Sequence, residues 1–365
     1  KNMANLDDAI LSIPSGGQIT NGTIAQYKAT SSTILKDTFV EFVDTQGAPE
    51  LVSELTTPFD LRDADGAVVA VWTYRASFRL LPLGNNRGVI AYLGYPSGDS
   101  STKYLYIAAF TVSGTDVTTG VSVRLPSFST TSEYNTYIAL DSLDTNKIIV
   151  TYCGSSGGAP SGTLAVVCNI SGTTITAGTE TTIMPSSKAK DVVAMSNSKF
   201  VASGNGSYVV CTVANNAITP GTTESFSNSV GNTILNAAEL IRLSDDKLLA
   251  YDNYSTTTGY AICTVSNMTL KVGPVNTAFP HFYTGNGASQ PVVLIDDTTF
   301  VSIGYVQDDR KNYAAIGRID GDFISLGGVT ELPSDYSYTP GDVRMVADGN
   351  ILYSYFPSGS NLNCM

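Results

Sequence analysis

Five cysteines are the most reactive side chains in this chain of 365 residues. Cys168, Cys211 and Cys263 each end an apolar, β-branched run and stand ten residues before a glycine. Phe110 and Gly317 take the same place in two further copies of the phrase. A disulfide or a metal site would need different cysteines to converge, whereas equivalent positions of a repeat lie apart. We therefore expect a buried packing position, because cysteine is a small and often buried residue.

The other candidates for nucleophilic or metal chemistry are isolated. His281 is the only histidine, so a multi-histidine metal site is excluded and a catalytic triad would have to use this residue. No G-x-S-x-G elbow lies near His281, and the chain has no C-x-x-C pair. Cys153 and Cys364 fall outside the repeat, and the sequence leaves their pairing open. We predict no metal and no cofactor.

Pairs of carboxylates are the signature of a glycosidase. Asp245-Asp246 and Asp296-Asp297 both occupy a repeated turn that contains Asn85-Asn86 in another copy. Asp and Asn suit such turns because they tolerate the turn conformation and bond their own backbone. Asp308 and Asp309 lie in a loop that does not repeat, where they could bind a cation or a sugar. No catalytic constellation is evident, so we predict a protein that is not an enzyme.

The elements that carry these residues recur. Six segments contain an apolar run, a tight polar turn and a second apolar run, and five of the six close on a tyrosine: Tyr92, Tyr152, Tyr251, Tyr305 and Tyr355, with Gly204 as the exception. Five of the segments are followed by the phrase that contains the cysteine position. The pattern predicts two hairpins, and so four strands, every 47 to 60 residues.

Four-stranded units of this length are typical of β-propeller blades. We predict an all-β protein, a β-propeller of six four-stranded blades, with seven possible. The sixth unit lacks its second hairpin, so we expect N-terminal strands to close the ring, from residues 38–44 or 67–76. Residues 1–48 read as an N-terminal β segment or attachment module that could join this closure, and residues 49–365 as the propeller.

Composition limits the possible partners. The formal net charge of −12 argues against nucleic-acid binding. No window approaches 18 consecutive apolar residues, so we expect no transmembrane helix. The first residues have no long apolar segment before a cleavage site, which argues against a signal peptide, and no initiator Met, which suggests a processed or truncated end.

The irregular loops predict a recognition surface. In a propeller, the loop between strands two and three opens on the same face as the loop to the next blade, and in this chain those loops are long and rich in Tyr, Gly, Ser and Asn. Such mixtures make adaptable binding surfaces on a rigid scaffold. The candidate ligand-binding residues are Tyr95, Tyr134, Tyr254, His281, Tyr283, Asp308, Asp309, Tyr336 and Tyr338.

The phrases "VCNISGTTITAGTET" and "ALDSLDTNKIIVTY" resemble repeats in phage tail-fibre and receptor-binding proteins, especially from viruses of Gram-positive bacteria. The N-terminal "GTIAQYKATSSTILKDTFVEFV" is similar to segments of the same kind of virion protein. The resemblance covers most of the chain from Gly22 onward and contains no catalytic motif. It implies a propeller held on a phage tail outside the cell, in contact with other virion tail proteins and with a host cell-surface glycan.

Three functional hypotheses follow. The first is a non-enzymatic virion protein that binds a host-surface glycan, with tyrosine rings stacked on sugars, and that forms a homo-oligomer for avidity. The second is a propeller glycoside hydrolase or lyase that acts on the same polymer, which would need acids that converge at the mouth of the central channel. The third is a structural virion protein that contacts neighbouring subunits.

Overall fold

The protein is all-β in the part of the chain that the computed structural model describes. Those residues are 42–45, 48–51, 60–71, 78–96, 101–113, 116–130, 137–153, 162–226, 235, 238–252, 259–276, 292–306, 311–331, 339–345, 351–356 and 363–364. They contain no helix. The chain divides into a larger unit, Phe59–Asp252 with Tyr260–Val275, and a smaller unit, Lys1–Pro58 with Asn253–Gly259 and Asn276–Met365.

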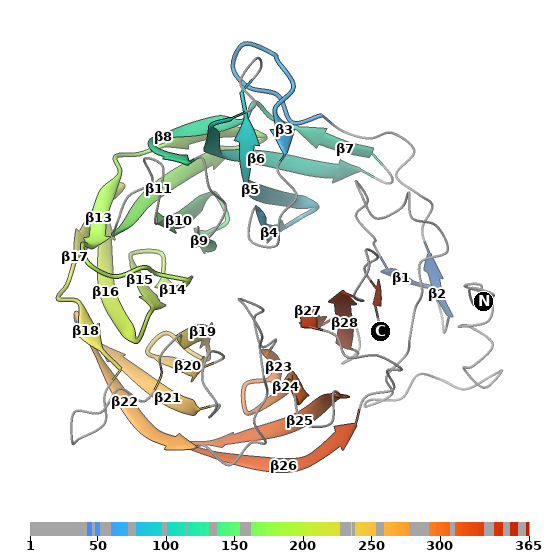
Figure 1. The fold of residues 1–365 in the computed structure, drawn as a ribbon, viewed down its shortest axis with the longest axis vertical. Helices are drawn as coiled ribbons and strands as arrows, with labels where there is room; N and C mark the ends of the chain where they lie inside the picture. The colour runs from blue at the N-terminus through green and yellow to red at the C-terminus, as the bar shows by residue number, and fades with distance from the viewer. Residues whose placement is uncertain are drawn as a thin grey trace. The chain divides into compact units, whose positions relative to one another are not determined.

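The larger unit contains four consecutive antiparallel sheets (Figure 1). The first sheet contains β3 (Ala70–Val71), β4 (Phe78–Gly84), β5 (Arg87–Tyr95), β6 (Lys103–Ser113), β7 (Asp116–Thr119) and β8 (Val123–Thr130). The second contains β9 (Tyr137–Asp144), β10 (Lys147–Cys153), β11 (Thr163–Ser171), β12 (Thr174–Ala177) and β13 (Thr181–Met184). The third contains β14 (Asp191–Ser196), β15 (Lys199–Gly204), β16 (Ser207–Ala214), β17 (Ala217–Pro220) and β18 (Glu224–Ser225). The fourth contains β19 (Ala238–Arg242), β20 (Lys247–Asp252), β21 (Tyr260–Ser266) and β22 (Thr269–Asn276).

The smaller unit contains a four-stranded sheet, a three-stranded sheet and a hairpin. The fifth sheet contains β23 (Val292–Asp296), β24 (Thr299–Val306), β25 (Lys311–Asp320) and β26 (Phe323–Glu331). The sixth contains β27 (Thr339–Met345), β28 (Ile351–Phe356) and β29 (Asn363–Cys364). The hairpin contains β1 (Phe42–Thr45) and β2 (Ala48–Leu51).

The turn residues explain the hairpins. Asn85 and Asn86, between β4 and β5, both have positive φ angles, of 52° and 56°. Asn215 and Asn216, between β16 and β17, also have positive φ angles, of 50° and 64°. Two successive positive φ angles are the requirement of a type I′ turn, which Asn satisfies at little steric cost. The predicted six first hairpins and five second hairpins are confirmed, and the propeller fold class with them; the number of blades stays a prediction.

The cysteine position is one half of a cross-strand pair that always combines a larger with a smaller residue. The five pairs are Gly88 with Phe110, Ile148 with Cys168, Phe200 with Cys211, Leu248 with Cys263, and Phe300 with Gly317. A Cβ atom on Gly88 or on Gly317 would lie 2.3 or 2.1 Å from the phenylalanine ring opposite, so the space is already filled. Burial raises the pKa of the thiols of Cys168, Cys211 and Cys263 to about 12, so they are not nucleophiles at neutral pH. The packing prediction is confirmed.

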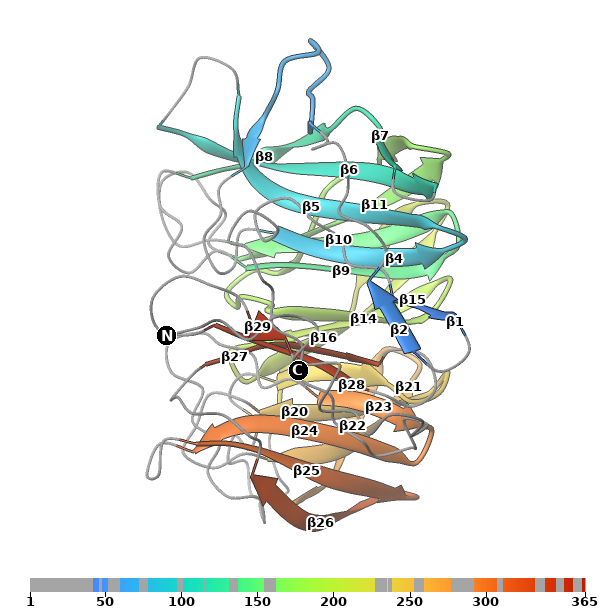
Figure 2. The same cartoon turned by 90° about the vertical axis from the view of Figure 1, so that its right-hand side faces the viewer.

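Three of these pairs lie in the seams between successive sheets of the larger unit. Cys168 belongs to the core cluster between the first two sheets, Cys211 to the cluster between the second and third, and Cys263 to the cluster between the third and fourth. Figure 2 shows the strands of the first three sheets running side by side across the view in successive layers. Stacked sheets bury both of their faces, which is why the middle strands read as continuous apolar runs.

The glycine ten residues after the cysteine position has its own steric reason. Gly120, Gly178 and Gly221 each donate an N–H hydrogen bond to the third strand of their own sheet (2.8 to 2.9 Å), where the fourth strand breaks in two. Their nearest neighbours include Thr173, Asn216 and Met268, which are residues of the second hairpin of the next sheet. A Cβ atom on Gly120 would lie 1.8 Å from the carbonyl oxygen of Thr173. Glycine therefore lets the next hairpin approach.

The ring-closure prediction for residues 67–76 is wrong. Ala70 and Val71 pair with Tyr95 and Gly94 of β5, next to β4, so this strand joins the first sheet rather than the last. The physical reason is the packing on the face of the first sheet that points away from the second sheet. On that face Leu61 and Val69 pack against Tyr92, Tyr106 and Ala108. These five residues form one buried cluster. In the other candidate segment, β1 pairs with β2.

The larger-with-smaller rule of the seam is testable in the fifth sheet. We expect Gly317→Cys to destabilise the protein by about 2 kcal/mol, because the new Cβ overlaps the buried ring of Phe300. Phe300→Ile alone should cost about 2 kcal/mol through the cavity it leaves. The double variant recreates the Ile–Cys pair of the second sheet and should recover most of both losses in a denaturant double-mutant cycle. Losses that simply add would contradict the rule.

Candidate functional site

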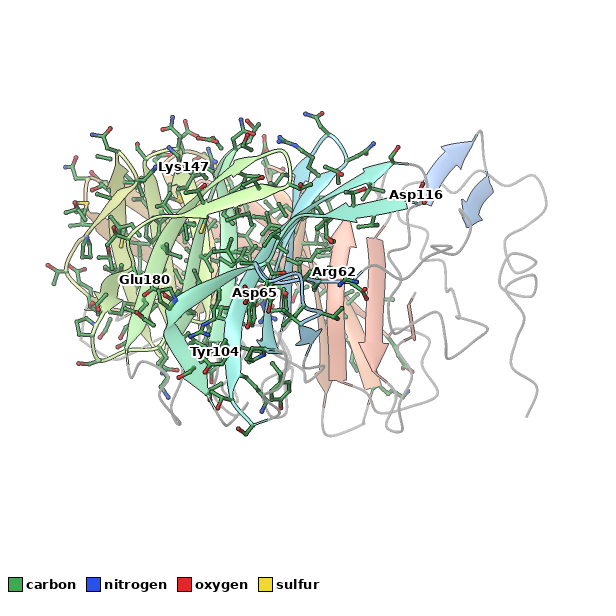
Figure 3. All side chains as sticks on the ribbon, turned by 90° about the horizontal axis from the view of Figure 1, so that it is seen from above. Arg62, Asp65, Tyr104, Asp116, Lys147 and Glu180 are labelled. Carbon is green, nitrogen blue, oxygen red and sulfur yellow. The ribbon has the colours of Figure 1, made fainter. Side chains whose placement is uncertain are left out.

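The two ends of the sheets in the larger unit differ. At the end that we call the turn end, strands one and two are joined by tight turns, as are strands three and four. At the opposite end, the loop end, the first strands begin and the second strands finish. Figure 3 shows Tyr104 at the loop end and Lys147 and Asp116 at the turn end.

One of the nine predicted ligand-binding residues is described by the structure. Tyr95 is the last residue of β5, at the loop end, and is partly buried. The other eight, Tyr134, Tyr254, His281, Tyr283, Asp308, Asp309, Tyr336 and Tyr338, lie outside the described residues. For them the binding surface stays a prediction.

Aromatic rings and cations pair at the loop end. The ammonium of Lys103 lies 5.6 Å from the ring centroid of Tyr95, and that of Lys190 lies 5.3 Å from the ring centroid of Tyr137. These two pairs occupy the loop ends of two consecutive seams, because Tyr95 shares its strand face with Leu93 and Tyr137 shares its own with Ala139.

A third pair lies on the other face of the first sheet. The Arg124 guanidinium lies 3.9 Å from the ring centroid of Tyr104, well within cation–π range. Sequence reasoning missed Tyr104, Tyr137 and their cations, because it considered loop tyrosines and these stand at strand ends. The phrase "KYLYIAAF" carried the signal, since it begins a buried strand with a partly exposed aromatic.

Two aspartates connect the first strands of neighbouring sheets. Asp141 of β9 accepts a hydrogen bond from the N–H of Ala194 in β14 (2.7 Å). Asp191 of β14 accepts one from the N–H of Leu240 in β19 (2.7 Å). In both residues the second carboxylate oxygen accepts the N–H of the residue that follows (2.7 and 2.8 Å). Each aspartate therefore holds two sheets together through main-chain donors. Because the donors are main-chain groups, these hydrogen bonds do not depend on the identity of the neighbouring side chains.

The second aspartate belongs to an acidic cluster. Burial, reinforced by the nearby Glu239 carboxylate, raises the pKa of Asp191 to about 7, although its two N–H donors oppose the shift. Tyr251 donates its phenol proton to Glu239 (2.8 Å), and its ring stacks on Tyr260. Burial raises the pKa of Tyr251 well above its usual value. The phenol therefore stays protonated, while Asp191 holds a proton over part of the neutral range.

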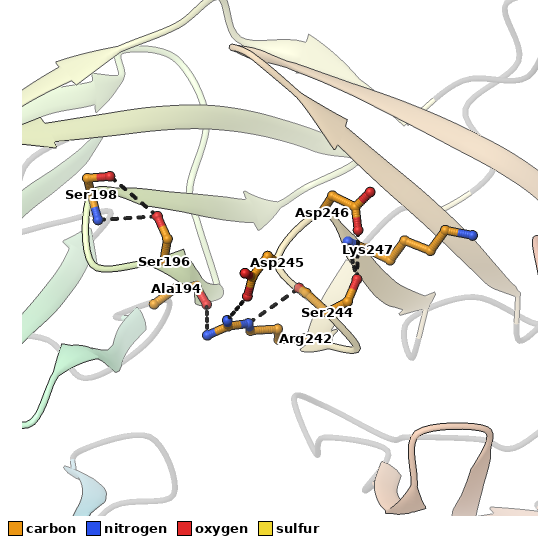
Figure 4. Close-up of polar contacts among 8 residues, drawn as sticks. All are labelled: Ala194, Ser196, Ser198, Arg242, Ser244, Asp245, Asp246 and Lys247. Carbon is orange, nitrogen blue, oxygen red and sulfur yellow. Dashed lines mark hydrogen bonds and ion pairs between the residues drawn. The ribbon is translucent and has the colours of Figure 1, made fainter.

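The pairs of aspartates at the turn end, Asp245-Asp246 and Asp296-Asp297, stabilise the turns in which they lie. Arg242 of β19 reaches the side chain of Asp245 (2.5 Å) and the carbonyl oxygens of Ser244 (3.3 Å) and Ala194 (3.5 Å), as Figure 4 shows. The hydroxyl of Ser244 donates to Asp246 (2.8 Å). In the fifth sheet, Asp296 accepts the N–H and the hydroxyl of Thr298 (2.7 and 2.8 Å). The prediction that Asp245-Asp246 and Asp296-Asp297 are turn residues is confirmed.

Cys153 is a free, buried thiol. Its sulfur lies 3.4 Å from the carbonyl oxygen of Ala189, and burial raises its pKa to about 12. The side chain of Cys364 lies outside the described residues, so its pairing with Cys153 stays untested. Among the described residues, no group of three or more His, Cys, Asp or Glu side chains is placed to hold a metal ion. The same part of the chain contains no helix of the length and apolarity that a membrane span requires.

The fold and these contacts define a repeat protein of the β-propeller class, with aromatic–cation pairs and an acidic cluster at the loop end. No protein-family model matches the chain, and no curated protein matches its sequence.

Solved structures offer only distant likenesses. A triple arginine-to-alanine mutant of AofleA from Arthrobotrys oligospora is 11% identical, with a TM-score of 0.48 over 84% of this chain and 90% of that one. Trypanosoma rangeli sialidase in complex with sialic acid is 12% identical, with a TM-score of 0.44 over 86% of this chain and 57% of that one. A putative 6-phosphogluconolactonase from Bacteroides uniformis is 9% identical, with a TM-score of 0.45 over 78% and 90%. None of them assigns a function to this chain.

The buried Asp191 makes a prediction about pH. Its pKa is about 7 in the folded state and about 4 in an unfolded chain, so the folded state keeps the proton in the range where the unfolded state has lost it. Stability should therefore fall as the pH rises from about 4 to about 7, and stay level above. Between pH 5 and pH 8 we expect the free energy of unfolding of Asp191→Asn to gain about 1–2 kcal/mol relative to that of the parent protein, after allowance for partial exposure.

Denaturant unfolding at several pH values measures this difference. Asp296→Asn is the matched control. Hydrogen bonds from the backbone and side chain of Thr298 lower the pKa of Asp296, so this group is already ionised throughout the range. Equal pH slopes for Asp191→Asn and the parent protein would contradict the assignment.

Proposed function

We propose that the protein is a non-enzymatic binding protein that recognises a glycan at the loop end of its sheets. The observation that carries the proposal is the pairing of tyrosine rings with cations at the loop end of two consecutive seams, Tyr95 with Lys103 and Tyr137 with Lys190. Tyrosine offers an apolar ring to a sugar face and a hydroxyl to its polar groups. Of the two cations, Lys103 is buried and Lys190 is partly exposed, and the charge of Lys190 favours a ligand that carries negative charge.

We further propose that this binding serves a virion. The support is the resemblance of the repeat phrases and of the N-terminal segment to phage tail-fibre and receptor-binding proteins. In that setting the protein stands outside the cell, contacts other tail proteins and forms a homo-oligomer. Several weak glycan sites in one particle add up to strong attachment.

Removal of the rings at the loop end tests the binding proposal. We expect Tyr95→Ala with Tyr137→Ala to weaken glycan-array binding or cell adsorption by about tenfold, since a lost aromatic contact is worth about 1–2 kcal/mol. Lys147→Ala, which changes the turn end, should leave binding unchanged. If the tyrosine variant remains folded and binds as tightly as the parent protein, the choice of surface is wrong.

A specific observation favours a second candidate, a glycoside hydrolase or lyase. Asp191, with a pKa of about 7, is a proton donor close to a second carboxylate, Glu239. Against catalysis, both oxygens of Asp191 are held by main-chain N–H groups, and Tyr251 is far too weakly acidic to be a nucleophile. We therefore keep it as the alternative.

The same glycan panel separates the two candidates when it is read for chain shortening. We expect the parent protein to retain glycans without shortening them. Shortening by the parent protein that is lost in Glu239→Gln, a change that preserves the hydrogen bond from Tyr251, would establish the enzyme instead. Neither retention nor shortening would favour the structural virion role.

A further inference from the structure

One face of the fifth sheet is covered differently from its counterparts. The residue just before the cysteine position points to the opposite face of its sheet, and it is 1% exposed or less in four sheets: Ala109, Val167, Val210 and Ile262. In the first three of these sheets, the cover includes the following sheet. In the fifth sheet the equivalent residue, Ile316, is 48% exposed. An apolar residue is therefore exposed to solvent at a position that is buried in the other four sheets.

The neighbouring strand shows the same departure. The first residue of strand four is polar or small in four sheets, and these residues are Asp116, Thr174, Ala217 and Thr269. In the fifth sheet it is Phe323, which is 68% exposed. Phe323 pairs with Asp320, so it points to the same face as Ile316. Two large apolar side chains thus share one uncovered area.

Gly327 supplies a second, independent sign. Its counterparts Gly120, Gly178 and Gly221 each lie against a residue of the second hairpin of the next sheet. Gly327 meets only atoms of Ile316 in its own sheet. The glycine that makes room for a neighbouring hairpin is present, whereas no described hairpin uses the room.

The sixth sheet has a matching free edge. In the second sheet, β10 pairs with β11 from Lys147 to Tyr152. In the sixth, β28 pairs with β29 only at Ser354 and Tyr355. Among the described strands, nothing pairs with the edge of residues 351–353 that faces away from β27. An edge with unpaired N–H and C=O groups accepts an added strand.

We propose that the hairpin of β1 and β2 docks there as the second hairpin of the sixth sheet, with Phe42 of β1 beside Ile351 at the start of β28 and with its closed end over Gly327. The hairpin has the required form, because two residues separate the paired Thr45 and Ala48, as two separate the paired Ser171 and Thr174. It also belongs to the same compact unit as the fifth and sixth sheets. The docked hairpin covers Ile316 and Phe323, whether or not the protein binds a glycan.

The second sheet fixes the expected register. Thr45 corresponds to Ser171 at the turn, so Phe42 corresponds to Cys168. Ile351 stands four residues before Tyr355, as Ile148 stands before Tyr152. Because Ile148 faces Cys168, Phe42 should face Ile351. Residues that face each other across antiparallel strands have the Cβ separation that a disulfide needs.

Cysteine cross-linking tests the docking in the full-length chain. In a Cys364→Ser background, Phe42→Cys with Ile351→Cys should form an intramolecular disulfide under mild oxidation, seen by peptide mapping. Val43→Cys with Ile351→Cys is the matched control, and its yield should be at least fivefold lower, because neighbouring strand residues point to opposite faces. A disulfide between two chains would assign the face to a second copy and overturn the proposal. Equal yields for the two pairs, or none for the first, would overturn it as well.

A stability measurement provides a second reading. Phe323→Thr restores the residue type of the second and fourth sheets, and we expect it to lower the thermal midpoint by about 2–5 °C, because a covered ring is lost. Val121→Thr replaces an apolar residue that is 54% exposed in the larger unit, and it should have no effect. A Phe323→Thr variant as stable as the control would show that the face is open to solvent, against the proposal.

Discussion

The structure depends on how the space between two stacked sheets is filled. At each of the three seams of the larger unit a cross-strand pair combines one larger and one smaller residue, from Ile148 with Cys168 to Leu248 with Cys263. Close packing leaves no room for two large residues and no tolerance for two small ones. This constraint fixes the register of strands two and three, and it explains why cysteine, phenylalanine and glycine alternate at one repeat position. The thiols are therefore packing groups, and the chemistry must lie elsewhere.

Polar groups inside the larger unit are used mainly to join sheets. Asp141 and Asp191 accept main-chain N–H groups from the next first strand, and Arg242 donates to the carbonyl of Ala194. Buried main-chain donors need such partners, so these carboxylates stabilise the stack even though burial raises their pKa values. The acids that would mark an enzyme are thereby occupied. The proposal of glycan recognition rests instead on the aromatic–cation pairs at the loop end.

Much of the fold could be predicted from the sequence because its signals are local. Three of these signals depend only on residues a few positions apart in the chain. They are the Asn85-Asn86 turn, the ten-residue spacing to Gly178 and the alternation around Cys168. The candidate site was less accessible, since Tyr104 and Lys190 become relevant only when different strands end at the same place. The position of residues 67–76 was wrong for a similar reason. Nothing in that segment records which sheet has an uncovered face.

The sequence by itself determined the repeat, its four strands and the packing role of its cysteines, because strand periodicity and turn chemistry are properties of short segments. Only the tertiary structure decided which side chains share a seam, since that depends on contacts between residues some 50 positions apart, such as Asp141 with Ala194 and Asp191 with Leu240. It also showed that Gly327 and Ile316 keep the form of a seam where no described hairpin fills it. Burial is a property of the assembled sheets, and no single segment carries it.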